Sequence, residues 1–158
     1  MQLKYPVQQE TRIVSNEKLA IKSYFSLYQL IMEPHNKEEI IRNYINAYNN
    51  FNVDDMIRVM HTEIEFINIT SGETSLTLIG IDAFKAQAEE ACRMFKKRQQ
   101  EIISIFYGDN HVEVDIHYKG IFAIDLPNGL KAGDPIEMKG KSVFQFHDGL
   151  ITKLVDMS

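Results

Sequence analysis

The sequence is poor in several features that identify specialised classes of protein. It has one cysteine, Cys92, in 158 residues, so it can form no internal disulfide and no cysteine-rich metal site, and we expect a reducing, cytoplasmic location. Its longest nearly apolar run, residues 24–32, is far shorter than the about 20 residues that cross a bilayer. No phosphate-binding glycine loop and no Gly-x-Ser-x-Gly elbow occurs. The acidic Glu10 and Glu17 argue against a signal peptide, so the start is expected to be mature chain.

Basic residues are also scarcer than acidic ones. The chain has 17 Lys and Arg against 22 Asp and Glu, a net charge of −5. Because affinity for a phosphate backbone rests on basic side chains that release counterions, nucleic acid is not an expected partner. The 44% hydrophobic and 25% charged residues are the mixture of an ordinary globular protein. No cofactor is expected.

The first part of the chain has the apolar spacing of helices. Residues 16–33 predict an amphipathic helix for which Pro34 is a typical stop. A second helix is predicted to begin after Asn36, which can form a capping box with Glu39. Its buried stripe consists of Ile40, Ile41, Tyr44, Ile45 and Tyr48.

Two further helices are predicted, one on each side of a first strand. Asn52 can cap a short helix that ends near His61. Residues 81–99 return to helical spacing, and residues 96–98, all basic, would then complement the negative end of the helix dipole. We interpret this basic trio as a solvated helix end rather than a binding patch.

Period-two patterns predict the strands. Ile64, Phe66 and Asn68 share one face of the first strand, and residues 76–79 can form a short extended piece. After Gln100 no helical period returns, and turn signals separate four further segments. These segments are residues 101–107, 111–124, 136–147 and 150–156. Helices first and antiparallel strands last is the α+β layout, in which helices cover one face of a curved sheet.

This order of elements resembles the nuclear transport factor 2-like superfamily, which includes SnoaL-like polyketide cyclases and ketosteroid isomerases. Residues 41–55, 80–84 and 144–151 carry the resemblance. It implies a cone-shaped, curved antiparallel sheet with a mixed edge, wrapped around helices, with an apolar pocket at its mouth and a homodimer formed through the outer sheet face. Residues 37–158 would form this domain, and residues 1–36 would be an added N-terminal helical extension.

The catalytic groups of a ketosteroid isomerase can be sought one at a time. Tyr44, followed by Ile45, matches the family's hydrogen-bonding tyrosine. The position of the family's base holds Asn68, and an amide is not a proton base near neutral pH. The second oxyanion position holds Ser142 instead of an acid. Standard isomerase activity is therefore disfavoured, and Asp156, on a strand of ambiguous register, is the nearest acid.

The candidate catalytic residues are accordingly Tyr44, Asn68 and Asp156. Each of the first two has a plainer interpretation, as a core tyrosine and as a strand-end polar group. The candidate ligand-binding residues are Tyr48, Phe66, Tyr118, Phe122, Ser142, Phe144 and Phe146. Aromatic side chains at period two in a sheet are more often core than pocket, so the five phenylalanine and tyrosine residues on strands carry that alternative.

A row of polar side chains on one strand raises the question of a metal. His111, Glu113, Asp115 and His117 alternate with apolar residues. Same-face neighbours on a strand stand roughly 7 Å apart, whereas zinc ligands converge at about 2 Å from one point. We therefore expect no metal site, and interpret the row as an outer sheet face that is solvated or forms a dimer contact. Cys92, with no adjacent histidine, is expected to pack rather than to react.

Two functional hypotheses follow. The first is a homodimer that binds a small, mostly apolar, carbonyl-bearing molecule in the cone pocket, as a SnoaL-like isomerase, cyclase or dehydratase of unknown substrate or as a binder without catalysis. The alternative is a non-catalytic homo-oligomeric assembly or interaction module, whose cone is filled by its own side chains. The extra N-terminal helix could dock on a neighbour or gate the cone mouth, and the sequence does not rank these two roles.

Overall fold

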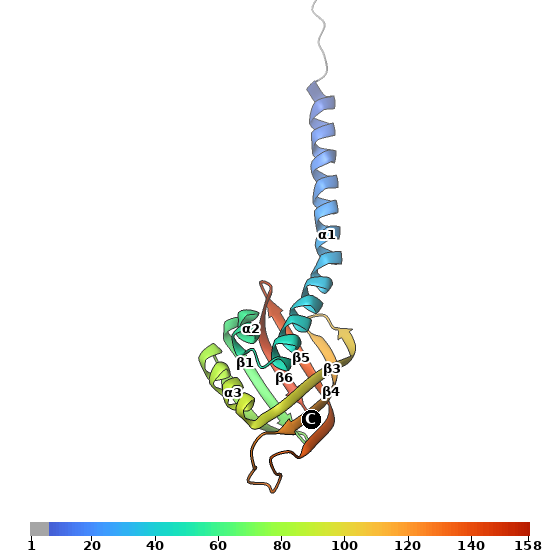
Figure 1. Cartoon of the computed structure of the whole chain (residues 1–158). Coiled ribbons are helices and arrows are strands. Elements are labelled where there is room, and N and C mark those ends of the chain that lie inside the picture. The colour runs from blue at the N-terminus through green and yellow to red at the C-terminus, as the bar shows by residue number, and fades with distance from the viewer. Residues whose placement is uncertain (1–6) are drawn as a thin grey trace, which may run out of the picture. The chain divides into compact units, whose positions relative to one another are not determined.

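A computed structural model describes the backbone of residues 7–158 and the side chains of those residues outside 7–18, 25 and 28–35. The chain divides into two compact units, Met1–Asn36 and Lys37–Ser158. The second unit contains the sheet (Figure 1) and the buried hydrophobic core.

The sheet of the second unit has six strands in the order β2-β1-β6-β5-β4-β3 (Figure 1). Neighbouring strands are antiparallel except β1 and β6, which run parallel. This is the predicted α+β class with a mixed sheet. The elements are α1 (Val7–Asn49), α2 (Val53–Arg58), β1 (Met60–Thr70), β2 (Glu73–Ile79), α3 (Ile81–Met94), β3 (Phe95–Tyr107), β4 (Val112–Phe122), β5 (Pro135–His147) and β6 (Leu150–Met157).

The prediction of two separate helices around Pro34 is wrong, because one helix, α1, is continuous from Val7 to Asn49. Proline removes one hydrogen bond of the helical ladder and can be accommodated when the turns on either side continue. Asn36 is therefore not an N-cap, since that position requires non-helical backbone. The cap predicted at Asn52 is confirmed: its side chain accepts a hydrogen bond from the Asp55 amide at 3.1 Å.

The fourth predicted helix is five residues too long. Helix α3 ends at Met94, and Phe95 is already extended. Residues 96–98 lie in β3, where backbone pairing with β4 over almost its whole length outweighs the helical pattern. The basic trio is thus no helix end: Lys96 and Lys97 are exposed, but Arg98 is only 5% exposed.

The core lies between the concave face of the sheet and the helices. Ile41 and Tyr44 of α1, with Phe84 of α3, pack against inward-facing strand residues such as Val114 and Phe144. The alternation of buried and half-buried positions along β4 gives the sheet one apolar face. The inner face of β1, β4, β5 and β6 therefore forms the wall against which a pocket can open.

Candidate functional site

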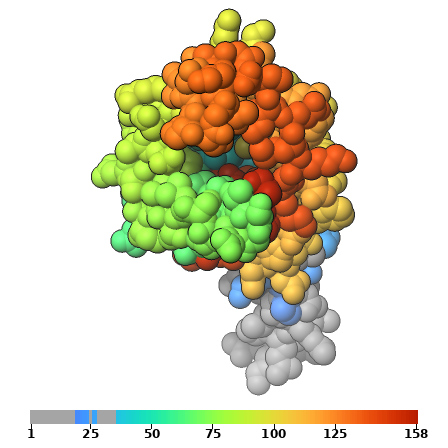
Figure 2. All heavy atoms as spheres, turned by 90° about the horizontal axis from the view of Figure 1, so that it is seen from below, coloured from blue at the N-terminus to red at the C-terminus, as the bar shows by residue number. Residues whose placement is uncertain are grey.

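A cavity of about 370 Å³ opens between the concave sheet face, α3 and the last turns of α1. In Figure 2 its mouth is the hollow framed by β2, α3 and the segment before β5, with atoms of β6 in its depth. Its walls are mostly apolar, as in small-molecule sites generally. The apolar lining includes Met56, Phe66, Leu76, Phe84, Ala88, Phe95, Ile116, Ile136 and Met138.

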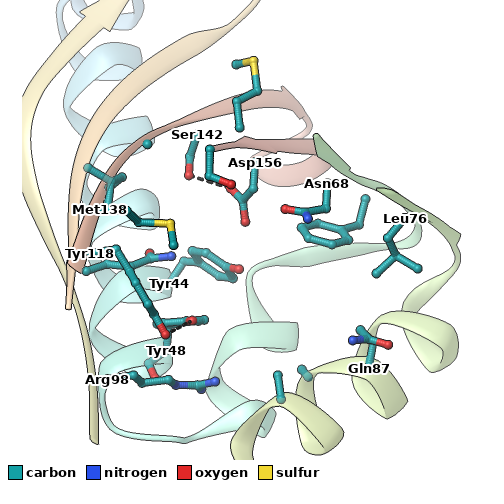
Figure 3. Close-up of a pocket in the computed structure, with 18 of the residues that line it drawn as sticks. Tyr44, Tyr48, Asn68, Leu76, Gln87, Arg98, Tyr118, Met138, Ser142 and Asp156 are labelled. Atoms are coloured by element: carbon teal, nitrogen blue, oxygen red, sulfur yellow. Dashed lines mark hydrogen bonds between the residues drawn. The ribbon is translucent and has the colours of Figure 1, made fainter. Parts of the chain in front are cut away.

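Asp156 of β6 faces this cavity, beside Asn68 on the neighbouring strand β1 (Figure 3). The Ser142 hydroxyl donates a 2.6 Å hydrogen bond to Asp156 Oδ1. Oδ2 forms no hydrogen bond with any residue that the structure describes. Burial raises the pKa of Asp156 from 3.8 to about 6, although the Ser142 hydrogen bond works in the opposite direction. The site thus holds a carboxylate with one free oxygen and more basicity than an ordinary aspartate.

This raised pKa has a consequence for stability. Because the folded state binds the Asp156 proton more tightly than the unfolded state, this group's contribution to the free energy of unfolding falls as pH rises from about 4 to about 6. The loss is at most about 3 kcal/mol above pH 7. Asp156→Asn removes the charge and keeps an acceptor for Ser142, so we expect it to stabilise the protein at pH 7.5.

Urea unfolding of both proteins at pH 7.5 and pH 5 measures this effect. We expect the variant's advantage to shrink by about half at pH 5, where much of the wild-type carboxyl is protonated. A variant less stable than wild type at pH 7.5 would show that the carboxylate is not destabilised by burial.

Tyr44 lies next to this carboxylate in the same cavity wall (Figure 3). Its ring packs edge-on against Phe144, with the ring centroids 5.9 Å apart. Its hydroxyl has no hydrogen-bond partner among the residues described. Burial, and secondly the charge of Asp156, raise the pKa of Tyr44 well above its usual value. The hydroxyl therefore stays protonated and can donate a hydrogen bond to a bound molecule.

Asn68 also lines the cavity, but its amide is already engaged. Asn68 Nδ2 donates to Ser75 Oγ at 2.8 Å and to Thr70 Oγ1 at 3.3 Å. An amide nitrogen has two hydrogens to donate, so both are used. The oxygen remains, and it can accept a hydrogen bond from a ligand hydroxyl. Asn68 thus does not supply the donor that would orient a ligand carbonyl.

A second polar group lies at the other end of the cavity. The hydroxyls of Tyr48 and Tyr118 are 3.5 Å apart. The pKa of both hydroxyls is raised, mainly because they are buried. Gln100 and Arg98 of β3 line the same end (Figure 3). The sequence prediction begins this strand at residue 101 and therefore leaves both residues out of the site. The period-two spacing of Arg98, Gln100 and the inward-facing Ile102 is the signal that indicates them.

Three of the aromatic candidates lie outside the cavity lining. Phe144 is fully buried and stacks on Phe146. Phe122 stacks on Phe95 behind the lining, with centroids 5.0 Å apart. These three phenylalanines therefore pack in or against the core and do not line the cavity. Tyr48, Phe66, Tyr118 and Ser142 do line the cavity.

The polar row on β4 forms ion pairs across the sheet. Glu113 pairs with Lys141 of β5. His117 Nε2 lies 2.6 Å from Oε1 of Glu137, which is also on β5. Within the described part of the chain, no group of three or more His, Cys, Asp or Glu side chains is placed to hold a metal ion.

Cys92 is half-buried and accepts a hydrogen bond from Arg98. None of the helices over the described residues is long and apolar enough to cross a membrane.

The family model for the SnoaL-like domain matches residues 41–154. The chain belongs to the SnoaL-like family. The match covers α2, α3, strands β1 to β5, the end of α1 and the first part of β6, and it ends two residues before Asp156. None of the curated proteins matches the sequence.

Solved structures share the SnoaL-like fold at low identity. A proposed polyketide cyclase from Xanthomonas campestris is 19% identical, with a TM-score of 0.67 over 78% of this chain and 90% of its own. A proposed SnoaL-like polyketide cyclase from Jannaschia is 13% identical, with a TM-score of 0.67 over 77% and 84%. A protein from Catenulispora acidiphila with a ketosteroid isomerase-like fold, in complex with trimethylamine, is 15% identical, with a TM-score of 0.63 over 75% and 83%. These likenesses bear out the predicted fold.

Proposed function

We propose that this SnoaL-like protein is an acid–base enzyme that moves a proton within a small, mostly apolar, carbonyl-bearing substrate. The observation that carries the proposal is the Asp156 carboxylate, which faces an apolar cavity with one oxygen free. Buried carboxylates of raised pKa, next to a hydrogen-bond donor, are typical of general acid–base sites. The comparison with polyketide cyclases of the same fold supports this class of reaction.

The proton transfer uses Asp156 as base. Its free oxygen takes a proton from the carbon next to the substrate carbonyl. The C–H electron pair then forms the carbon–carbon double bond of an enolate, and negative charge moves to the carbonyl oxygen. Asp156 returns the proton to the same or another carbon and is regenerated. Asp156, on β6, therefore takes the role of the base that the family resemblance places at the position of Asn68, on β1.

Tyr44 has the complementary role. A protonated hydroxyl held in an apolar wall can donate a hydrogen bond to the enolate oxygen as its charge develops. Because the hydroxyl has no partner among the described side chains, no existing hydrogen bond has to break first. The Tyr44 ring, fixed against Phe144, limits the movement of the donor.

Hydrogen–deuterium exchange of a probe ketone tests the proposal without knowledge of the natural substrate. We choose 2-tetralone, a bicyclic ketone with exchangeable hydrogens next to its carbonyl. Proton NMR in D₂O at pH 7.5 follows the loss of these signals with and without protein. We expect exchange above the buffer rate, and exchange at the buffer rate alone would contradict the proposal.

We also propose that the protein is a homodimer through the outer sheet face. The edge strand β3 carries Ile103 and Phe106, each 55% exposed, and exposed apolar side chains of this kind are typical of interfaces. Sedimentation equilibrium should give about twice the mass of the 18.3 kDa chain. The double variant Ile103→Glu, Phe106→Glu should give a monomer, because it would bury charge in the interface. A variant that remains dimeric would place the interface elsewhere.

A further inference from the structure

Arg98 is a buried cation whose position the acid–base chemistry does not use. Arg98 is only 5% exposed, and it lines the cavity at the end away from Asp156 (Figure 3). No carboxylate of the described residues lies within ion-pair distance of it, whereas the exposed arginines Arg58 and Arg93 each have one. Buried charges are normally paired, because removing a charge from water is costly.

The contacts of Arg98 leave much of its hydrogen-bonding capacity unused. A guanidinium has five N–H donors. Arg98 Nε donates to the Tyr48 carbonyl at 2.9 Å, and Nη2 donates to Cys92 Sγ at 3.4 Å. The guanidinium carbon lies 3.8 Å from the centre of the Tyr48 ring and 4.5 Å from that of Phe51. The third nitrogen, Nη1, makes no hydrogen bond to any residue described.

A structural role explains part of this arrangement. The Tyr48 carbonyl belongs to the last turn of α1, where a cation is favourable and unused carbonyls need donors. The hydrogen bond from Arg98 Nε to the Tyr48 carbonyl fulfils this structural role and uses only one of the five donors. It does not account for the remaining N–H groups at the cavity, where a ligand can reach them.

Gln100 adds a second unsatisfied group at the same end. Its Oε1 is fully shielded from solvent and has no hydrogen-bond partner in the part of the chain that the structure describes. Its backbone is fixed by Asn49, which exchanges two hydrogen bonds with it at 2.7 and 3.0 Å. Arg98 and Gln100 stand two residues apart on the inner face of β3, so one ligand can meet both. Because Oε1 only accepts hydrogen bonds, it needs a donor such as a ligand hydroxyl, whereas the Arg98 guanidinium needs an acceptor. Unused buried polar groups in a cavity point to a ligand that satisfies them.

We propose that the Arg98 end of the cavity binds a carboxylate of the substrate. The substrate would then be an apolar organic acid, with its anionic group at Arg98 and its reacting carbonyl at Tyr44 and Asp156. Tyr48 and Tyr118, at the Arg98 end, would contact the adjoining part of its apolar body. This inference deepens the proposed function and rests on it, because both place the ligand in the same cavity.

A pair of fluorescent probes that differ in one anionic group tests the inference. The anion 8-anilinonaphthalene-1-sulfonate and the neutral N-phenyl-1-naphthylamine share one ring system, and the sulfonate stands in for a carboxylate. Both are titrated against wild type and Arg98→Met. Arg93→Met, which removes an exposed arginine paired with Glu90, is the matched control. Unfolding in urea verifies that each variant is folded, and Arg98→Gln replaces Arg98→Met if the latter does not fold.

We expect Arg98→Met to weaken binding of the sulfonate probe at least about 10-fold, the effect of a lost hydrogen bond to a charged group. Binding of the neutral probe should change less than about two-fold, and Arg93→Met should affect neither. Equal losses for both probes, or no loss for the anion, would overturn the carboxylate site and leave cavity binding intact. Ala91→Trp, which fills the cavity, should abolish binding of both probes; undiminished binding of both would instead contradict the proposed function.

Discussion

Asp156→Asn should lower the rate of 2-tetralone exchange by at least about 100-fold, because an amide cannot take the proton that the carboxylate removes from carbon. The Asn side chain is nearly the same size and can still accept the Ser142 hydrogen bond, so cavity shape is preserved. The exchange rate is measured by proton NMR in D₂O at pH 7.5. In the wild type the rate should also rise through a pH of about 6, as the carboxyl loses its proton.

Asp115→Asn is the matched control for this change. Asp115 lies on β4 and accepts a 2.7 Å hydrogen bond from Ser104, away from the cavity lining. The control should retain the wild-type exchange rate. Equal rates for Asp156→Asn and wild type would remove Asp156 from the mechanism.

Tyr44→Phe is expected to reduce the same exchange rate by about 100-fold, the usual effect of removing one donor from a developing oxyanion. The phenyl ring retains the edge-on packing against Phe144, so the fold should persist. Binding of the neutral naphthylamine probe should be nearly unchanged, because the lost hydrogen bond forms mainly in the transition state. Tyr107→Phe, at a tyrosine 48% exposed, is the control and should have no effect. A Tyr44→Phe enzyme with wild-type exchange would leave the hydroxyl without a catalytic role.

Function and stability oppose each other at this site. The carboxylate of Asp156 is useful as a base because burial raises its pKa, and the same burial makes the charged form unfavourable in the folded state. Asp156→Asn is thus expected to be inactive and more stable at neutral pH. Such opposition is common where active sites hold unfavourable groups in place.

The fold was predictable because the period of the apolar residues changes along the chain. Helical spacing dominates the first part of the chain and alternation dominates after Gln100, which predicts the α+β class, and the family match covers residues 41–154. The errors lie at element ends. Pro34 does not end α1, and the pairing of β3 with β4 extends the strand back over residues that alone favour a helix.

Part of the site could not be predicted because of irregular strand pairing. The register between β5 and β6 shifts after Gln145, so that Phe146 pairs with Ile151 but Gln145 pairs with Lys153. Strict alternation from the buried Ile151 would turn Asp156 away from the cavity, whereas the bulge brings it in. A bulge of this kind leaves little signal in a single sequence. Tyr44 and Ser142 are predictable from the family resemblance, because each lies in a regular helix or strand segment that can be matched position by position.

The pKa of the Asp156 carboxyl tests the central claim most directly. It can be followed by carbon-13 NMR of the aspartate side-chain carboxyl signals as pH is changed, with Asp156→Asn identifying the signal. The measurement needs no substrate. A midpoint of about 6 is the expected result. A midpoint near the ordinary value of an aspartate, about 4, would mean that Asp156 is a solvated carboxylate, and would contradict its proposed role as a buried base.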